Sequence, residues 1–175
     1  GIGQLVLRHA LNTAGIEHYP EFQYDMVRLG IGLYGEGHSE AFQKKLRPVG
    51  TLKARVLQIK KITSGESVGY SRSFKAEDAK RIATVAVGYA DGLPRALGNG
   101  KGSLIWKGKS LPILGNVCMD MCMVDVTGLD CHVGDEMEFF GHNQSLSSIA
   151  DQLETISYEV LSSIPGRVKR TYVQE

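Results

Sequence analysis

The stretch Gly65–Arg95 concentrates residue types that can move a proton or hold an anion. Its middle, Arg81–Val87, is a β-branched and apolar run with the pattern of a buried strand. A glycine–tyrosine pair precedes this run at Tyr70, another follows it at Tyr89, and Arg95 lies beyond the second pair. A rigid strand that carries two tyrosines and an arginine at its ends can build a site. The alternative is a turn-rich surface hairpin, because glycine–aromatic turns are common.

Arg28 stands inside an apolar run, Met26–Leu33, that predicts a buried strand. A buried guanidinium needs a partner, because leaving it unpaired is very costly. One interpretation is structural, an ion pair with Asp25 or a salt bridge at the end of a barrel. The other is functional: Arg28 holds an anionic or acceptor group of a ligand, and backbone N–H groups near Gly30 reach a phosphate.

Metal and nucleophile chemistry find little support in the sequence. Cys118 and Cys122 fall on one face of an apolar run, but a zinc site usually needs a second matched pair, so we expect packing cysteines and no metal. No nucleophile elbow, Walker or dinucleotide glycine motif is present. The histidines are scattered without ligand spacing: His9, His18, His38, His132 and His142.

Composition narrows the class of protein further. The net charge of +1 argues against nucleic-acid partners and an anionic membrane surface. No apolar run approaches the length of a membrane span, and no signal peptide opens the chain. Three cysteines cannot pair into a framework, which favours a reducing, cytoplasmic location.

The elements that must position these residues fall into two parts. A short β/α-type segment occupies residues 1–46, and a mainly β domain, a sandwich or a barrel, occupies 47–175. The amphipathic pattern predicts one helix over Leu146–Tyr158, followed by a helical turn. Strands are expected over Val49–Ile62, Arg81–Val87, the hairpin Gly102–Leu114, Val117–Val126, Gly134–Phe140 and Val168–Val173.

Six segments in order resemble alanine racemases. They are NTAG at Asn12, DMVRLGIGLYG at Asp25, SVGYSRSF at Ser67, VAVGYADGLPRAL at Val85, GNVCMDMCMVDV at Gly115 and ETISYEVL at Glu154. The resemblance runs along essentially the whole chain but covers only the C-terminal half of the family. It implies the last strands of a truncated TIM-type, cofactor-binding α/β barrel over 1–46. An antiparallel β-barrel-like domain with one or two helices is then expected over 47–175. The ending RVKRTYVQE also resembles members fused behind a cell-wall peptide ligase.

Alanine racemases interconvert L- and D-alanine on pyridoxal 5'-phosphate (PLP), and the resemblance implies that activity here, in the service of peptidoglycan synthesis. It also implies a homodimer whose site is shared between subunits. Racemisation needs one group to remove the α-proton and another to return it from the opposite face. Tyr70 matches the family's tyrosine base, and Arg28 matches the arginine that faces the pyridine nitrogen of PLP.

The other matched positions would bind the cofactor phosphate or the substrate. Thr13, Gly30, Ile31 and Tyr158 match residues that bind the phosphate. Substrate-binding matches are Met119 and Asp120, near the substrate carboxylate, and Tyr89 and Arg95, at the substrate access path.

The chain departs from the family pattern at one decisive residue, the lysine that carries PLP. Its motif is absent, and Lys53, Lys60, Lys61 and Lys75 have no matching context. We therefore expect the chain alone to be inactive. Two other interpretations stay open: a racemase of the same fold for serine, lysine or a broad set of amino acids, and a non-catalytic dimerisation or regulatory β domain.

Overall fold

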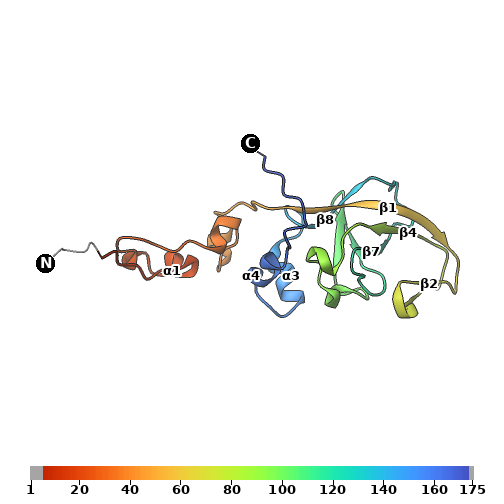
Figure 1. The fold of residues 1–175 in the computed structure, drawn as a ribbon, viewed down its shortest axis with the longest axis horizontal. Coiled ribbons are helices and arrows are strands. Elements are labelled where there is room, and N and C mark those ends of the chain that lie inside the picture. Colours follow the sequence, from red (N-terminus) through yellow and green to blue (C-terminus); the bar gives the residue numbers. More distant parts are fainter. Residues whose placement is uncertain (1–5, 174–175) are drawn as a thin grey trace. The chain divides into compact units, whose positions relative to one another are not determined.

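The computed structural model describes residues 6–173 (Figure 1). The chain divides into two compact units, the first ending at Gly50 and the second beginning at Thr51. Within residues 6–173, no helix has both the length and the apolar character needed to cross a membrane.

The first unit is built from short helical segments: α1 (Thr13–His18), η1 (Pro20–Phe22), η2 (Ile31–Tyr34) and α2 (Glu40–Gln43). Two of them begin at side-chain caps. The Asn12 side-chain oxygen accepts the N–H of Gly15, and the Ser39 hydroxyl accepts the N–H of Phe42. Such caps satisfy N–H groups that have no partner inside the helix.

The expected strand over Met26–Leu33 is wrong. Its pairing is limited to an isolated parallel bridge between His9 and Met26, within the described residues of this unit. The backbone then turns at Gly30, with φ −116° and ψ −102°, and enters η2. Apolar content alone predicted the strand, but a strand persists only where neighbouring strands extend the ladder. The side chain of Leu29 is accordingly exposed.

The second unit is a six-stranded antiparallel sheet in the order β6-β5-β8-β1-β4-β7. Its centre is the long strand β1 (Leu52–Ile62), which pairs with β8 through its first half and with β4 through its second. The other strands are β4 (Lys80–Val85), β5 (Ser103–Trp106), β6 (Lys109–Pro112), β7 (Cys122–Asp125) and β8 (Glu136–Phe140).

The two outer strands of this sheet come back together. An antiparallel bridge joins Ile113, just after β6, to Val124 in β7, and the N–H of Leu114 donates to the carbonyl of Met123 at 2.8 Å. The sheet is therefore nearly closed, and the expected mainly β, antiparallel barrel-like fold is confirmed.

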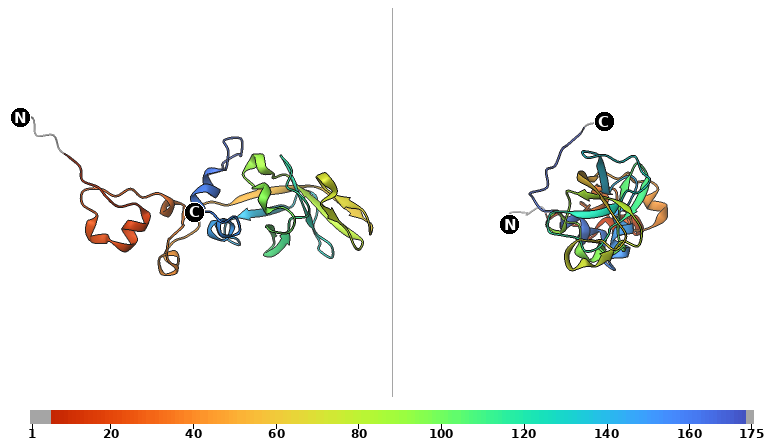
Figure 2. Two further views of the ribbon diagram at one scale, coloured as in Figure 1. Left: turned by 90° about the horizontal axis from the view of Figure 1, so that it is seen from below. Right: turned by 90° about the vertical axis from the view of Figure 1, so that its right-hand side faces the viewer.

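Shorter helices and strands lie at the two ends of the sheet. The helices α3 (Leu146–Gln152) and α4 (Ser157–Ser162) lie at one end of this unit, and the ribbon of β2 (Ser67–Val68) and β3 (Phe74–Lys75) lies at the other (Figures 1 and 2). Within its described residues, 51–173, the unit also contains the single-turn helices η3 (Tyr70–Arg72), η4 (Tyr89–Asp91) and η5 (Arg95–Leu97).

The hairpin of β5 and β6 follows the sequence expectation. Its turn is Lys107–Gly108, with φ of 46° and 77°. Positive φ at both central positions is what a two-residue hairpin turn needs to match the twist of its strands. Other expectations change in extent or fail. The strand expected over Val117–Val126 begins only at Cys122, and Val168–Val173 is not a strand.

The single helix expected over Leu146–Tyr158 is two helices. The break lies between Gln152 and Ser157, where Glu154 has a left-handed φ of 55° and the N–H of Thr155 turns back to the carbonyl of Ala150. The apolar spacing continues across the break because both helices pack against the same core. Periodicity alone could not locate this interruption.

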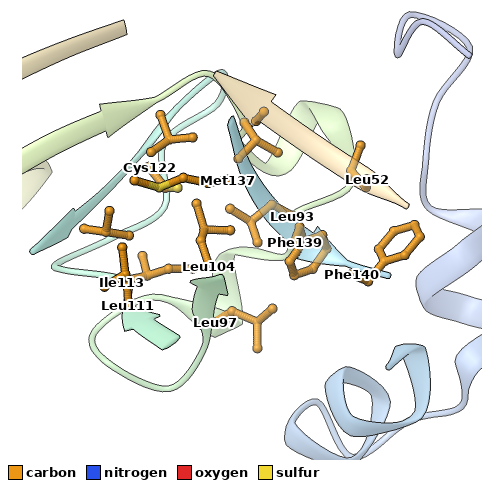
Figure 3. Packing of buried hydrophobic residues seen from close by; sticks show 14 of the residues in the cluster. Leu52, Leu93, Leu97, Leu104, Leu111, Ile113, Cys122, Met137, Phe139 and Phe140 are labelled. Carbon is orange, nitrogen blue, oxygen red and sulfur yellow. The ribbon is translucent and has the colours of Figure 1, made fainter. Parts of the chain in front are cut away.

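The core lies inside the curled sheet and under α3 (Figure 3). Phe139 on β8, Leu104 on β5 and Ile113 after β6 are at most 1% exposed, and Phe139 packs edge-on against Phe140 with ring centroids 5.8 Å apart. Close packing of this kind means that a lost side chain leaves a void.

We predict that Phe139→Ala destabilises the second unit by about 3–5 kcal/mol, through lost burial and the cavity that remains. Urea unfolding followed by circular dichroism measures the change in free energy of unfolding. Val133→Ala is the matched control, because Val133 is 62% exposed. A change below about 1 kcal/mol for Phe139→Ala would contradict the assigned packing.

An ion pair joins two neighbouring strands at their ends. Lys80 Nζ on β4 lies 2.9 Å from Asp125 Oδ2 on β7, and both side chains are about three-quarters buried. Burial opposes ionisation of Asp125, but hydrogen bonds from Thr127 and Lys80 outweigh it and lower the pKa of the carboxyl. A carboxyl with a lowered folded pKa contributes stability above its unfolded pKa and loses that contribution as the pH falls through the folded value.

We predict that Asp125→Asn costs about 1 kcal/mol at pH 7 and flattens the loss of stability on acidification below the unfolded carboxyl pKa of about 4. Urea unfolding of wild type and variant between pH 7 and pH 3 measures both effects. Asp151→Asn on the exposed face of α3 is the control. Parallel pH profiles for wild type and Asp125→Asn would show that the pair does not carry this dependence.

Candidate functional site

Tyr70 begins a single helical turn, η3, that is held in unusual backbone geometry. Gly69 before it has φ 75°, and the two residues after it, Ser71 and Arg72, have φ of 60° and 49°. Two consecutive non-glycine residues in the left-handed region carry a conformational cost. The Asn116 side-chain amide donates to the Tyr70 carbonyl at 3.2 Å and fixes the turn from outside. The Tyr70 side chain is left 73% exposed.

The loop of residues 118–121 lies beside this turn. The loop directly precedes β7, and within it the N–H of Cys118 donates to the carbonyl of Met121 at 2.9 Å. Together with Tyr70 it lines a pocket of about 370 Å³. The lining residues are Gly69, Tyr70, Cys118, Met119, Asp120, Met121 and Met123. The structure therefore brings three of the residues expected from the sequence to one place: Tyr70, Met119 and Asp120.

The turn that carries Tyr89 is tied to the same loop through the backbone. The N–H of Tyr89 donates to the carbonyl of Cys118 at 3.0 Å, and the N–H of Ala90 donates to the carbonyl of Met119 at 2.9 Å. Gly88 permits this approach, because a Cβ there would lie 2.3 Å from the Met119 carbonyl oxygen. Tyr89 and Arg95 do not line the pocket; both side chains are exposed on η4 and η5.

The residues expected to bind a phosphate are split between the two units. In the first unit, the buried hydroxyl oxygen of Thr13 accepts the N–H groups of Gly30 at 3.1 Å and Gly32 at 3.3 Å. Ile31 is the first residue of η2, where an N–H has no carbonyl of its own helix to pair with. Tyr158 lies on α4 in the second unit and is 39% exposed.

Arg28 is exposed rather than buried, and it does not pair with Asp25. Asp25 accepts hydrogen bonds from the backbone N–H of Arg8 at 2.9 Å and from its guanidinium at 3.1 Å, and these two bonds lower the pKa of the Asp25 carboxyl. One guanidinium nitrogen of Arg28, Nη2, donates to the carbonyl of Ala10 at 2.9 Å. This single contact orients the side chain and leaves other N–H donors of the fork for a ligand.

Arg167 and Asp91 belong to the site, although no sequence pattern indicated them. Arg167 Nη2 lies 2.6 Å from Asp120 Oδ1 and 2.7 Å from Asp91 Oδ1, so one guanidinium joins the two loops. In the sequence these residues are visible only as an arginine after Pro165–Gly166 and as one aspartate in each of the two loops. Nothing in their spacing along the chain indicates that the three residues meet.

The cysteines of this region are buried to different degrees. Burial raises the pKa of the Cys118 thiol and raises that of Cys122 to about 12, so both thiols are protonated at neutral pH. Across residues 6–173, no group of three or more histidine, cysteine or acidic side chains is arranged to hold a metal ion.

Comparison with known proteins places these features in a family. Residues 49–172 match the family described as alanine racemase, C-terminal domain. The chain is 42% identical over 176 aligned residues to the alanine racemase of Desulfosudis oleivorans and to alanine racemase 1 of Clostridium acetobutylicum. Each alignment covers 96% of this chain and 45% of the relative, so the chain spans about half the length of the curated relatives it matches.

A solved structure gives the same result at the level of the fold. The alanine racemase of Bartonella henselae, determined with covalently bound pyridoxal phosphate, matches with a TM-score of 0.85 and 38% identity. The match covers 93% of this chain and 46% of that one. The family match over residues 49–172, together with this structural similarity, shows that the chain belongs to the alanine racemase family, within its C-terminal part.

Proposed function

We propose that this chain is the C-terminal part of a PLP-dependent racemase that interconverts L- and D-alanine. The observation that carries the proposal is the pocket in which Tyr70 lies beside Met119 and Asp120. Its relatives are named alanine racemases, and one of them was solved with covalently bound pyridoxal phosphate. D-Alanine formed in this way would serve peptidoglycan synthesis in the cytoplasm.

Tyr70 takes the role of one of two acid–base groups. Its exposed hydroxyl is free to approach the α-carbon of an amino acid from one face. Met119 and Asp120 form the neighbouring wall, where the substrate carboxylate would bind. Tyr89 and Arg95, exposed on the adjoining turns, would control access. Among residues 6–173, the Arg95 side chain has no ion pair or hydrogen bond, so its charge is available to an approaching carboxylate.

The first unit would hold the cofactor. Bound PLP withdraws electrons from the substrate and so acidifies its α-proton. Thr13 fits the cofactor phosphate, because its oxygen already accepts two N–H groups and its own hydrogen remains to be donated. In the same unit, Ile31 at the start of η2 would contribute its backbone N–H. Arg28 would face the pyridine nitrogen, and its permanent positive charge keeps that nitrogen unprotonated.

The second acid–base group must come from outside this chain, since no lysine in it has the context of the PLP-bearing lysine. The exposure of Tyr70 supports a site that is shared with a second subunit. A tyrosine exposed to water is a poor base at neutral pH, and a cationic neighbour in a closed site is what would activate it. We therefore infer a homodimer in which each pocket is completed by a partner.

We predict that the 175-residue chain alone does not racemise alanine. Purified chain is incubated with L-alanine and added PLP, and D-alanine is measured with a D-amino-acid oxidase assay. The positive control is a full-length racemase made by joining this chain to the N-terminal half of a relative that carries the cofactor lysine. Clear turnover by the chain alone would contradict the requirement for the missing lysine.

We predict that Tyr70→Phe in the full-length racemase lowers exchange of the L-alanine α-proton with D₂O by about 10²-fold or more, the usual loss when a general base is removed. The affinity for PLP, measured by absorbance titration, is expected to stay within about twofold, because the ring remains in place. Tyr172→Phe is the matched control, since Tyr172 is 91% exposed. Equal proton exchange in wild type and Tyr70→Phe would show that Tyr70 is not the base.

A further inference from the structure

Arg167 connects the two loops that form and support the pocket, and none of the site roles inferred from the sequence includes it. Its Nε donates to Asp91 Oδ1 at 2.9 Å, and its Nη2 donates to Asp120 Oδ1 at 2.6 Å. Nη2 also lies 2.7 Å from Asp91 Oδ1. The planar fork of a guanidinium suits such contacts, because its N–H groups point in fixed directions toward two acceptors.

The contacts continue from the side chains into the loop backbones. While one oxygen of Asp91 accepts from Arg167, the other accepts the N–H of Gly88 at 3.0 Å. At Gly88 the turn of Tyr89 approaches the loop of Met119 so closely that an added Cβ would lie 2.3 Å from the Met119 carbonyl oxygen. Arg167 therefore acts on both sides of that approach, through Asp91 on one loop and Asp120 on the other.

The charges explain why an arginine is needed at this place. Two carboxylates that share one donor nitrogen would repel each other without a cation between them. The hydrogen bond from Arg167 to Asp120 raises the pKa of the guanidinium most, and the one to Asp91 raises it further. Arg167 is therefore charged throughout the pH range in which the protein is folded. The contact is partly exposed, with 48% of the Arg167 side chain accessible, so its main effect is on local geometry rather than global stability.

The segment that carries Arg167 is anchored independently of it. Ile164 packs against Gly92, where an added Cβ would lie 2.5 Å from the Ile164 Cδ1 atom. Arg170 donates to the carbonyls of Ile164, Pro165 and Val168 at 3.0–3.2 Å. The path of the chain after α4 thus has its own supports, and the fork of Arg167 is left to join the loops.

We propose that Arg167 is a positioning residue: by holding Asp91 and Asp120 together, it fixes the backbone of Met119 and Asp120 for binding of the substrate carboxylate. The nature of the ligand rests on the proposed function, whereas the joining of the loops does not. Because Arg167 follows α4 in the chain, the same contact also links the segment of Tyr158 to the substrate loop.

The first test measures the loops without any activity. Amide hydrogen exchange of the 175-residue chain at pH 7 reports on the N–H groups of Tyr89 and Ala90, which bond to the 118–121 loop. Arg167→Gln is expected to speed their exchange about fivefold, which corresponds to a partly exposed ion pair. The amide of Ala83 in β4 should not change, which verifies folding. Arg170→Gln is the matched control, since it loses an arginine of the same tail but no carboxylate contact.

The second test measures binding in the full-length racemase. Arg167→Gln is expected to raise the KM for alanine about tenfold with a smaller change in kcat, as when an interaction common to ground and transition states is lost. The affinity for PLP and its absorbance should not change. Arg167→Lys should recover part of the KM, because lysine restores the charge but not the fork. Arg170→Gln should leave KM within about twofold of the parent.

Each outcome decides one part of the inference. Unchanged exchange at Tyr89 and Ala90 in Arg167→Gln would overturn the joining of the loops. Faster exchange with an unchanged KM would overturn the role in substrate positioning. An equal rise in KM for Arg167→Gln and Arg170→Gln would also overturn it, because a merely structural tail would explain both. Absence of turnover in the parent racemase would contradict the proposed function, while the exchange result would still decide whether Arg167 holds the loops.

Discussion

Two backbone hydrogen bonds, from the N–H groups of Tyr89 and Ala90 to the carbonyls of Cys118 and Met119, are the constraint on which the rest of the pocket depends. They require the two loops to approach so closely that no Cβ fits at Gly88, although the φ of −140° there is open to any residue. The glycine is therefore demanded by contact and not by backbone conformation. Once the loops are joined, Met119 and Asp120 are held beside Tyr70, and the site no longer depends on flexible side chains alone.

The barrel-like sheet makes that approach possible. Strands β4 and β7 pair antiparallel, with Val85 opposite Cys122, so the chain leaving β4 and the chain entering β7 emerge at the same end of the sheet. The pairing brings together residues that are distant in sequence. The core beneath is closed by the contact of Ile113 with Val124, which leaves this end of the sheet little freedom to spread. The rigid strands thus fix the positions of the loops, and the loops contribute the residues of the site.

The sequence predicted those parts of the fold whose signals are local. Alternation along Leu52–Ile62 and the glycine turn at Lys107–Gly108 were sufficient for β1 and for the β5–β6 hairpin. It failed where tertiary contacts decide: Met26–Leu33 is apolar yet forms no strand, and the helix expected over Leu146–Tyr158 breaks near Glu154. In the site, the resemblance supplied Tyr70, Met119 and Asp120. The role of Arg167 could not be predicted from the sequence, because it depends on two aspartates that lie near it only in the folded chain.

The exposure of Tyr70 and the lack of a matching lysine are independent features that lead to the same requirement. A phenol surrounded by water lacks the cationic neighbour that would favour the phenolate near neutral pH. Burying it within its own unit would disfavour the phenolate further and would also remove it from the substrate. A site completed by another segment or subunit resolves this conflict, since closure supplies the dry environment and the missing groups together. Ser71 and Arg72, both in the left-handed region, directly follow Tyr70, whose side chain is exposed, and strained backbone of this kind is concentrated at functional sites.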